Sequence, residues 1–241
     1  MPLSEEPIST ASGLPASGAR SSRRCFEALA PLGAARGTGD RALASIANTA
    51  TQAQRLRHQL VPFNGKGFGS PVAYPEHRSG FPKRLAGLAA MLAGGLPLRC
   101  VALRAHGMYD THSDQPDQLA QGLKLTGESL LAFQRDLEAR GLADRVLTLV
   151  WSEFGRRAAE NGSRGTDHGA AGVALLMGTR VRGTMIGELP RLRDGLDEDG
   201  NLKASVDYRS LYASLLEQWF DFDAAGAIPD ARAYRRLQLV T

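Results

Sequence analysis

The sequence predicts an α/β protein in which a parallel or mixed sheet is flanked by helices. Two observations lead to this fold class. Segments whose apolar residues have helical spacing alternate along the chain with short, nearly continuous apolar runs, and such runs are typical of strands buried between layers of helices. In addition, polar, turn-rich segments follow two of these runs, as expected where strands end at one edge of a sheet.

The N-terminal part of the chain has the composition of a flexible segment. Residues 1–39 are rich in Ser, Pro, Gly and Ala, and their apolar residues show little periodicity, which favours disorder. A helix is predicted over residues 40–60, and the Gly- and Pro-containing stretch 62–82 is predicted to be a loop. We therefore divide the chain into a flexible segment, 1–39, and an α/β domain, 40–241.

Three helices are predicted in the rest of the chain. The first runs from Phe81 to Gly94, where a Gly-Gly pair ends its apolar pattern, and the second ends near Gly141. The third begins after Ser205 or Asp207, either of which is a suitable N-cap. The buried side of the second helix is predicted to consist of apolar residues at helical spacing: Leu119, Leu123, Leu130, Phe133 and Leu137.

Three apolar runs are predicted to be the strands of the sheet. They are LRCVALR (98–104), VLTLVW (146–151) and VALLM (173–177). Ligands of open α/β sheets bind beyond the carboxyl ends of the strands. The polar loops 105–116 and 152–171 both begin at such an end, so we expect them to meet at one edge of the sheet.

The first polar loop carries two candidate metal ligands. In extended backbone residues i and i+2 point to the same side, so Asp110 and His112 are predicted to reach a common ion. A carboxylate oxygen and an imidazole nitrogen suit Zn²⁺, Mn²⁺ or Fe²⁺. The alternative interpretation is an Asx-turn followed by a surface histidine.

The second polar loop carries four further candidates. Glu153 follows the strand and is predicted to be a metal ligand or a general base, and Arg156 is predicted to clamp an anion such as phosphate. Asp167 and His168 lie between glycines that allow sharp turns and close approach to a ligand. The alternative is a flexible surface loop in which Glu and Arg form a weak ion pair. Taken together, the two loops predict one metal centre.

The overall charge excludes some classes of partner. The formal net charge is +4, but no basic run is interleaved with aromatic residues, so nucleic-acid binding is not expected. No apolar stretch has the length of a membrane span, and no secretory signal is recognisable in the chain as written. On these grounds we expect a cytoplasmic protein. The predicted role of Arg156 as an anion clamp makes a small anionic substrate the expected ligand.

Three ordered motifs carry a resemblance to a known family. GMYDTHSDQ, VLTLVWSEFGRRAAENGSRGTDHG and DYRSLYASLLEQWF resemble the bacterial family "domain of unknown function fifteen-oh-one", usually placed in the alkaline phosphatase/sulfatase superfamily. The resemblance covers about residues 40–221. It implies a sheet between layers of helices, with one or two metal ions at the carboxyl edge.

The resemblance also implies roles for individual residues. Asp110 and His112 would bind the first metal, Glu153 would replace a metal-binding acid, and His168 would be a further ligand, oriented by Asp167. Phe154 stands where an imidazole is usual, which argues against a full second metal site.

Part of the family pattern has no counterpart in this sequence. Family members normally begin with a twin-arginine export signal, then a strand and a Gly-rich loop that carries the presumed nucleophile. Residues 1–40 contain nothing similar, so the chain resembles the C-terminal half of the family domain. The incomplete sheet is then expected to self-associate or to bind a partner that completes it.

Two functions remain open at this stage. The first is a metal-dependent hydrolase of phosphate or sulfate esters. The alternative is a non-catalytic, truncated α/β domain or binding module, with or without a bound metal.

Overall fold

The computed structural model describes residues 41–63 and 69–241 of the chain, which divides into two units, Met1–Gly67 and Phe68–Thr241. In the first unit helix α2 (Arg41–Leu60) continues into the 3-10 helix η1 (Val61–Phe63), so the helix predicted there is confirmed. The predicted flexible segment 1–39 lies outside the described residues. Among the described residues, no helix combines the length and the apolar character needed to cross a membrane.

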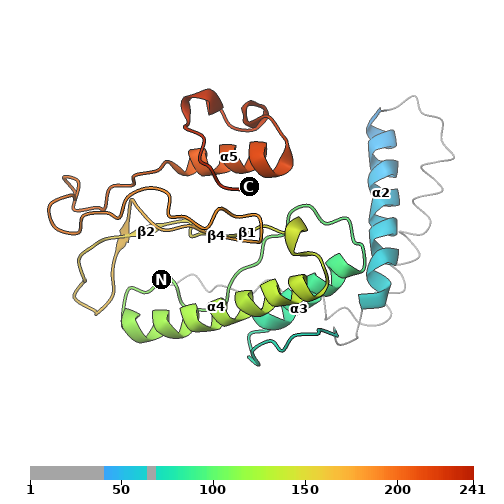
Figure 1. The fold of residues 1–241 in the computed structure, drawn as a ribbon, viewed down its shortest axis with the longest axis horizontal. Coiled ribbons are helices and arrows are strands. Elements are labelled where there is room, and N and C mark those ends of the chain that lie inside the picture. Colours follow the sequence, from blue (N-terminus) through green and yellow to red (C-terminus); the bar gives the residue numbers. More distant parts are fainter. Residues whose placement is uncertain (1–40, 64–68) are drawn as a thin grey trace. The chain divides into compact units, whose positions relative to one another are not determined.

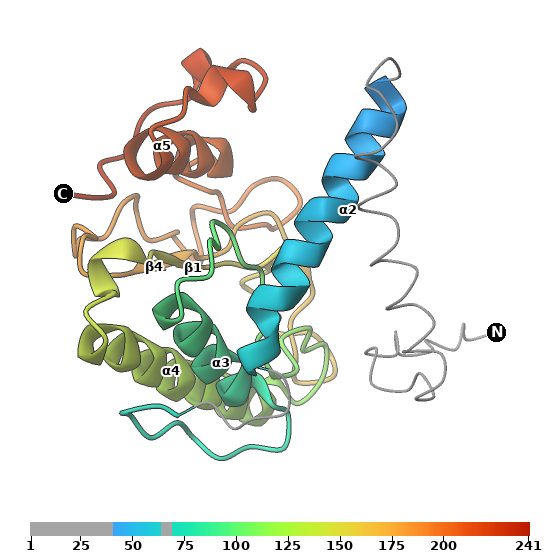
Figure 2. The same ribbon diagram turned by 90° about the vertical axis from the view of Figure 1, so that its right-hand side faces the viewer.

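The second unit has a layered arrangement of helices and short strands (Figure 1). Its helices are α3 (Phe81–Ala93), α4 (Gln115–Ala139) and α5 (Tyr208–Phe220), with the 3-10 helices η2 (Ala143–Arg145), η3 (Ala224–Gly226) and η4 (Ala231–Ala233). Its strands are β1 (Thr148–Val150), β2 (Gly155–Arg156), β3 (His168–Gly169) and β4 (Leu175–Met177). In both views the β1–β4 ribbon lies between the α3–α4 pair and α5 (Figure 2). The α/β class is therefore confirmed.

The main hydrophobic core forms where α3 packs on α4. Phe81, Leu85 and Ala89 of α3 meet Phe133 and Leu137 of α4, and all five are buried. Helix α3 begins after a glycine in the left-handed conformation, has a proline in its first turn and ends at a glycine cap. These signals locate both ends of the helix as predicted from the sequence.

The buried face of α4 differs in part from the predicted apolar stripe. Phe133 and Leu137 are buried as predicted, but Leu123 is 55% exposed. Thr126 and Ser129 are buried in its place. Their hydroxyls have partners: Tyr109 Oη lies 2.5 Å from Thr126 Oγ1, and Ser129 donates to the carbonyl of Leu125 at 2.6 Å. Because these hydroxyls are hydrogen-bonded, Thr126 and Ser129 can face the core without a large loss of folding free energy.

A buried carboxylate ties the chain before α3 to the end of α4. Asp136, which is fully buried, forms an ion pair with Arg140 at 2.6 Å and accepts hydrogen bonds from Ser70 Oγ and Tyr74 Oη at 2.9 and 3.0 Å. Burial and the hydrogen bond to this carboxylate raise the pKa of Tyr74. The satisfied charge explains why a polar residue is tolerated next to Leu137.

Helix α5 begins where the sequence predicts. Asp207 is its N-cap and accepts a hydrogen bond from the backbone N–H of Arg209 at 2.8 Å. Near the other end of the helix, Glu217 forms two hydrogen bonds with the guanidinium of Arg236, at 2.6 and 2.7 Å. This pair fastens the C-terminal stretch to α5.

The prediction of a parallel or mixed sheet is wrong for the described residues. Strands β1 and β4, which correspond to the predicted runs 146–151 and 173–177, pair directly with each other and are antiparallel. A parallel pair needs a crossover connection, usually a helix. The segment between β1 and β4 instead turns back on itself as a second antiparallel ribbon, β2–β3, so the chain returns in the opposite direction.

The strand predicted over 98–104 is also absent. This segment forms no ladder with any described strand, and Val101 and Leu103 are 48% and 39% exposed. A strand is defined by its paired neighbour, which an apolar run alone does not supply. The two short antiparallel ribbons do not establish the alkaline-phosphatase-like architecture that the resemblance implies.

Shortening a core leucine should destabilise this unit far more than shortening a surface leucine on the same helix. Leu137→Ala removes a fully buried side chain and should lower the free energy of unfolding by about 2–5 kcal/mol. Leu131→Ala, at a position that is 47% exposed, should change it by about 0.5 kcal/mol or less. Urea denaturation followed by circular dichroism measures both, and equal effects would contradict the assigned core.

Candidate metal centre

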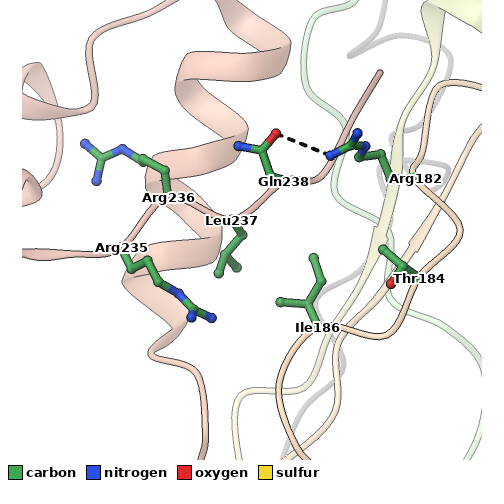
Figure 3. A pocket seen from close by; sticks show the side chains of 7 residues that line it. All are labelled: Arg182, Thr184, Ile186, Arg235, Arg236, Leu237 and Gln238. Atoms are coloured by element: carbon green, nitrogen blue, oxygen red, sulfur yellow. Dashed lines mark hydrogen bonds between the residues drawn. The ribbon is translucent and has the colours of Figure 1, made fainter.

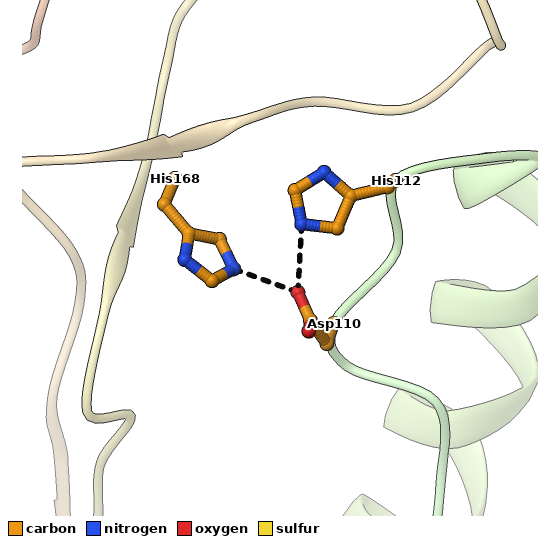
Figure 4. A group of neighbouring side chains, drawn as sticks. All are labelled: Asp110, His112 and His168. Atoms are coloured by element: carbon orange, nitrogen blue, oxygen red, sulfur yellow. Dashed lines mark hydrogen bonds and ion pairs between the residues drawn. The ribbon is translucent and has the colours of Figure 1, made fainter. Parts of the chain in front are cut away.

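Three side chains from the two polar loops converge on one point (Figure 4). Asp110 and His112 precede α4, and His168 lies in β3. Asp110 Oδ1 is 3.1 Å from His112 Nε2 and 2.7 Å from His168 Nε2. One ligand atom from each of the three residues lies within 4.8 Å of the others. The predicted meeting of the two loops is therefore found in the structure.

The donor set and its spacing fit a small divalent transition-metal ion. One carboxylate oxygen and two imidazole nitrogens are ligands that zinc, manganese and iron accept. In a tetrahedral zinc site with the usual bond lengths, neighbouring ligand atoms are about 3.3 Å apart. The two Nε2–Oδ1 separations, 3.1 and 2.7 Å, are slightly shorter, so a small outward movement of the rings would admit the ion.

Backbone hydrogen bonds hold the two loops together. Thr166 N donates to the carbonyl of Thr111 at 3.3 Å, and Asp114 N donates to the carbonyl of Ser163 at 3.1 Å. A third bond of 2.9 Å joins Gln115 N to the carbonyl of Arg164. The loop that carries His168 is thereby fixed against the loop that carries Asp110.

The β2–β3 ribbon sets the position of His168. Its register places Arg156 opposite His168 and Gly155 opposite Gly169. A Cβ atom on Gly155 would lie only 2.0 Å from the carbonyl oxygen of Ala171, so only glycine permits this close approach of two backbones. Gly155 thus serves the packing of the loop.

Arg156 braces the two loops through their backbone carbonyls. Its guanidinium donates to the carbonyl of Tyr109 at 2.6 Å, to that of Thr111 at 3.5 Å and to that of Thr166. It also lies 3.4 Å from Asp110 Oδ1. The sequence predicts that Arg156 clamps an anion. Most of its guanidinium N–H groups, however, already donate to acceptors within the protein.

Two further residues orient the histidines of the triad. Asp167 Oδ1 lies 3.3 Å from His112 Nδ1, the ring nitrogen that does not face Asp110. A carboxylate in that position fixes the tautomer and the orientation of a metal-binding imidazole. The ring of Phe154 stacks on that of His168, with centroids 3.9 Å apart and an interplanar angle of 11°.

The surroundings keep both aspartates in the ionised form that a metal ion requires. The hydrogen bond with His168 holds the pKa of Asp110 below its usual value, and the charges of the two imidazoles and Arg156 act in the same direction. Hydrogen bonds from Asn161 and His112 lower the pKa of Asp167. Both carboxylates are exposed, so these effects are screened by water.

The predicted site residues therefore occupy different positions around the cluster. Asp110, His112 and His168 form it, and Asp167 contacts one of its histidines. Glu153 is exposed, lies outside the cluster and has no hydrogen bond or ion pair with the described residues.

Sequence reasoning missed Asn161, which joins the loops through its side chain. Its amide donates to the carbonyl of His112 at 3.0 Å and to Asp167 Oδ1 at 3.3 Å. Its Oδ1 accepts hydrogen bonds from the backbone N–H groups of Ser163 and Gly165, at 2.9 and 3.0 Å. The Asn-Gly pair that begins this turn is the signal in the sequence that would have identified it.

One family matches the part of the chain that contains the site. Residues 76–229 match the family described as "Protein of unknown function (DUF1501)". The matched range includes the whole triad and the residues that orient it. No curated protein and no solved structure matches the chain.

Two glycines of the second loop provide a matched test of its packing. A Cβ atom on Gly165 would lie 2.2 Å from the carbonyl carbon of His112, whereas one on Gly162 would meet no atom within 4 Å. Gly165→Ala should therefore lower the free energy of unfolding by about 1–3 kcal/mol. Gly162→Ala should leave it unchanged or raise it by about 0.4–1 kcal/mol.

Chemical denaturation of both variants, with the histidine proton resonances recorded in the folded state, checks this prediction. The resonances of His112 and His168 should shift in the Gly165 variant and stay in place in the Gly162 variant. Identical behaviour of the two variants would show that the loops are not packed as described.

Proposed function

The chain belongs to the DUF1501 family of proteins of unknown function, and from that premise we propose that it is a metal-dependent hydrolase of small phosphate or sulfate esters. The observation that carries the proposal is the convergence of Asp110, His112 and His168, with their ligand atoms within 4.8 Å of one another. Zinc, manganese or iron is the proposed ion, because the donors are one carboxylate and two imidazoles.

Each residue of the centre has a distinct task in this proposal. Asp110 supplies the negative charge that offsets the charge of the ion, and His112 and His168 complete three protein ligands through Nε2. Three protein ligands with an open position are typical of catalytic zinc sites. Asp167 holds His112 in orientation, and Phe154 limits rotation of the His168 ring.

The exposure of the centre suits a reaction with a dissolved ester and water. The side chains of Asp110, His112 and His168 are 56%, 49% and 47% exposed, so substrate and water reach them directly. When bound, the ion would lower the pKa of a water ligand and stabilise negative charge on the ester oxygens. The resemblance to the alkaline phosphatase/sulfatase superfamily favours phosphate or sulfate esters as the substrate class.

A specific observation favours a second candidate, a metal-binding module without catalysis. Glu153 stands outside the cluster, and the guanidinium of Arg156 is engaged by backbone carbonyls. Glu153 therefore adds no second acid to the triad, and Arg156 has few donors left for the anion. Metal binding is common to both candidates, and turnover distinguishes them.

Loss of one proposed ligand should abolish tight metal binding. His168→Ala removes an imidazole of the triad and should weaken binding of Zn²⁺ or Mn²⁺ by more than about 100-fold. Substitution of a residue that only supports a ligand lowers metal affinity by up to about 100-fold, and loss of a ligand itself should have a larger effect. His58→Ala, in α2, removes a histidine that does not belong to the triad and should leave the affinity unchanged. Competition with a chromophoric chelator measures the affinity, and elemental mass spectrometry of the purified proteins measures their metal content. Equal affinities of the two variants would overturn the assigned centre.

Activity should depend on the same carboxylate as metal binding. The metal-loaded protein should hydrolyse p-nitrophenyl phosphate or p-nitrophenyl sulfate, and Asp110→Asn should lose this activity because the amide no longer supplies a charged ligand. Release of p-nitrophenol, followed with each metal in turn, gives the rate. A protein that binds metal tightly but releases no product from either ester would support the metal-binding module instead.

A further inference from the structure

A hollow on the C-terminal side of the unit has the features of a second ligand site, and we propose that it binds a small organic anion with an apolar body. The hollow has a volume of about 350 Å³ and shares no residue with the metal centre. Pockets for small molecules have volumes of about 300–1,000 Å³. Its lining consists of Arg182, Thr184, Ile186, Arg235, Arg236, Leu237 and Gln238.

Two segments that are distant in sequence form the walls of the hollow. The stretch after β4 and the C-terminal stretch are joined by an antiparallel bridge between Val181 and Val240. A backbone hydrogen bond of 2.9 Å from Arg182 N to the carbonyl of Leu239 continues this pairing. The residues that the first segment contributes, 182, 184 and 186, alternate along the chain, as do side chains on one face of extended backbone.

The charges around the hollow are unbalanced. Three arginines line it, and no acidic residue does. Arg236 is already paired, because Glu217 accepts two of its hydrogen bonds at 2.6 and 2.7 Å and the carbonyls of Ala231 and Tyr234 accept others. This arginine is therefore part of the wall and has little capacity left for a ligand.

The other two arginines are available to a ligand. The guanidinium of Arg182 makes a single hydrogen bond with the described residues, to Gln238 Oε1 at 3.5 Å, and that of Arg235 makes no hydrogen bond or ion pair with them. Figure 3 shows Arg182 at the upper right of the hollow and Arg235 at the lower left, with Leu237 and Ile186 between them. A guanidinium binds a carboxylate or a phosphoryl group through two parallel hydrogen bonds.

The apolar residues define the rest of the ligand. Leu237 is buried and forms part of the wall, whereas Ile186 is only partly buried. The exposed part of Ile186 is therefore the apolar surface that a ligand would cover. An inorganic anion would use the arginines alone, and a neutral apolar molecule would use only the leucine and isoleucine. An anionic head on an aliphatic or aromatic body engages both.

The test uses 2-naphthoate as the probe, with isothermal titration calorimetry on the full chain in the presence of a chelator. The variant Arg182→Ala/Arg235→Ala should weaken binding of 2-naphthoate by about tenfold or more. The charge-matched control Arg193→Ala/Arg232→Ala, at exposed positions outside the lining, should bind as the wild type does. The neutral analogue 2-naphthol should bind more weakly than 2-naphthoate and should be insensitive to loss of the two arginines.

A second variant keeps the test decisive if the double variant is poorly folded. Ile186→Glu places a negative charge against the ligand and should abolish binding of 2-naphthoate while both arginines remain. Titration with 2-naphthylphosphonate shows whether the site prefers a phosphoryl head to a carboxylate. The proposal is overturned if the wild type does not bind either anion, or if the folded variants bind them as tightly as the wild type.

Discussion

The backbone pairing between the loop that precedes α4 and the loop that carries His168 is the interaction on which the candidate metal centre depends. Asp110 and His168 are far apart in sequence, and they meet because backbone hydrogen bonds join the loops, Arg156 spans three of their carbonyls and Gly165 packs directly on the backbone of His112. Fixed backbones of this kind hold exposed ligands in place without burying them.

The antiparallel β2–β3 ribbon determines which of the predicted site residues reach the triad and which do not. Because β2 and β3 fold back on each other, His168 returns to the side of Asp110, while Glu153 stays outside the cluster. The same ribbon places Phe154 against the His168 ring. The outcome is a triad of candidate ligands with Asp167 beside one of its histidines, and three protein ligands are the number typical of a single catalytic zinc ion.

The unit also carries a group of arginines that line a hollow, and none of them belongs to the candidate metal centre. Its origin is the packing of the C-terminal stretch on α5, where the Glu217–Arg236 pair fixes the chain. That attachment sets Arg235 and Leu237 along the hollow opposite Arg182. The hollow and the candidate metal centre share no residue.

Local signals in the sequence determined the helices and the identity of the candidate metal ligands. Glycine and proline at the ends of α3 and the Asp207 cap of α5 act through neighbouring residues, and the chemistry of Asp110, His112 and His168 belongs to their side chains. Tertiary structure alone decided the direction of the strands, the lack of a partner for 98–104 among the described residues and the use of Arg156 as a brace. Each of these depends on which distant segment supplies the hydrogen-bonding partner, and an apolar pattern along one segment does not carry that information.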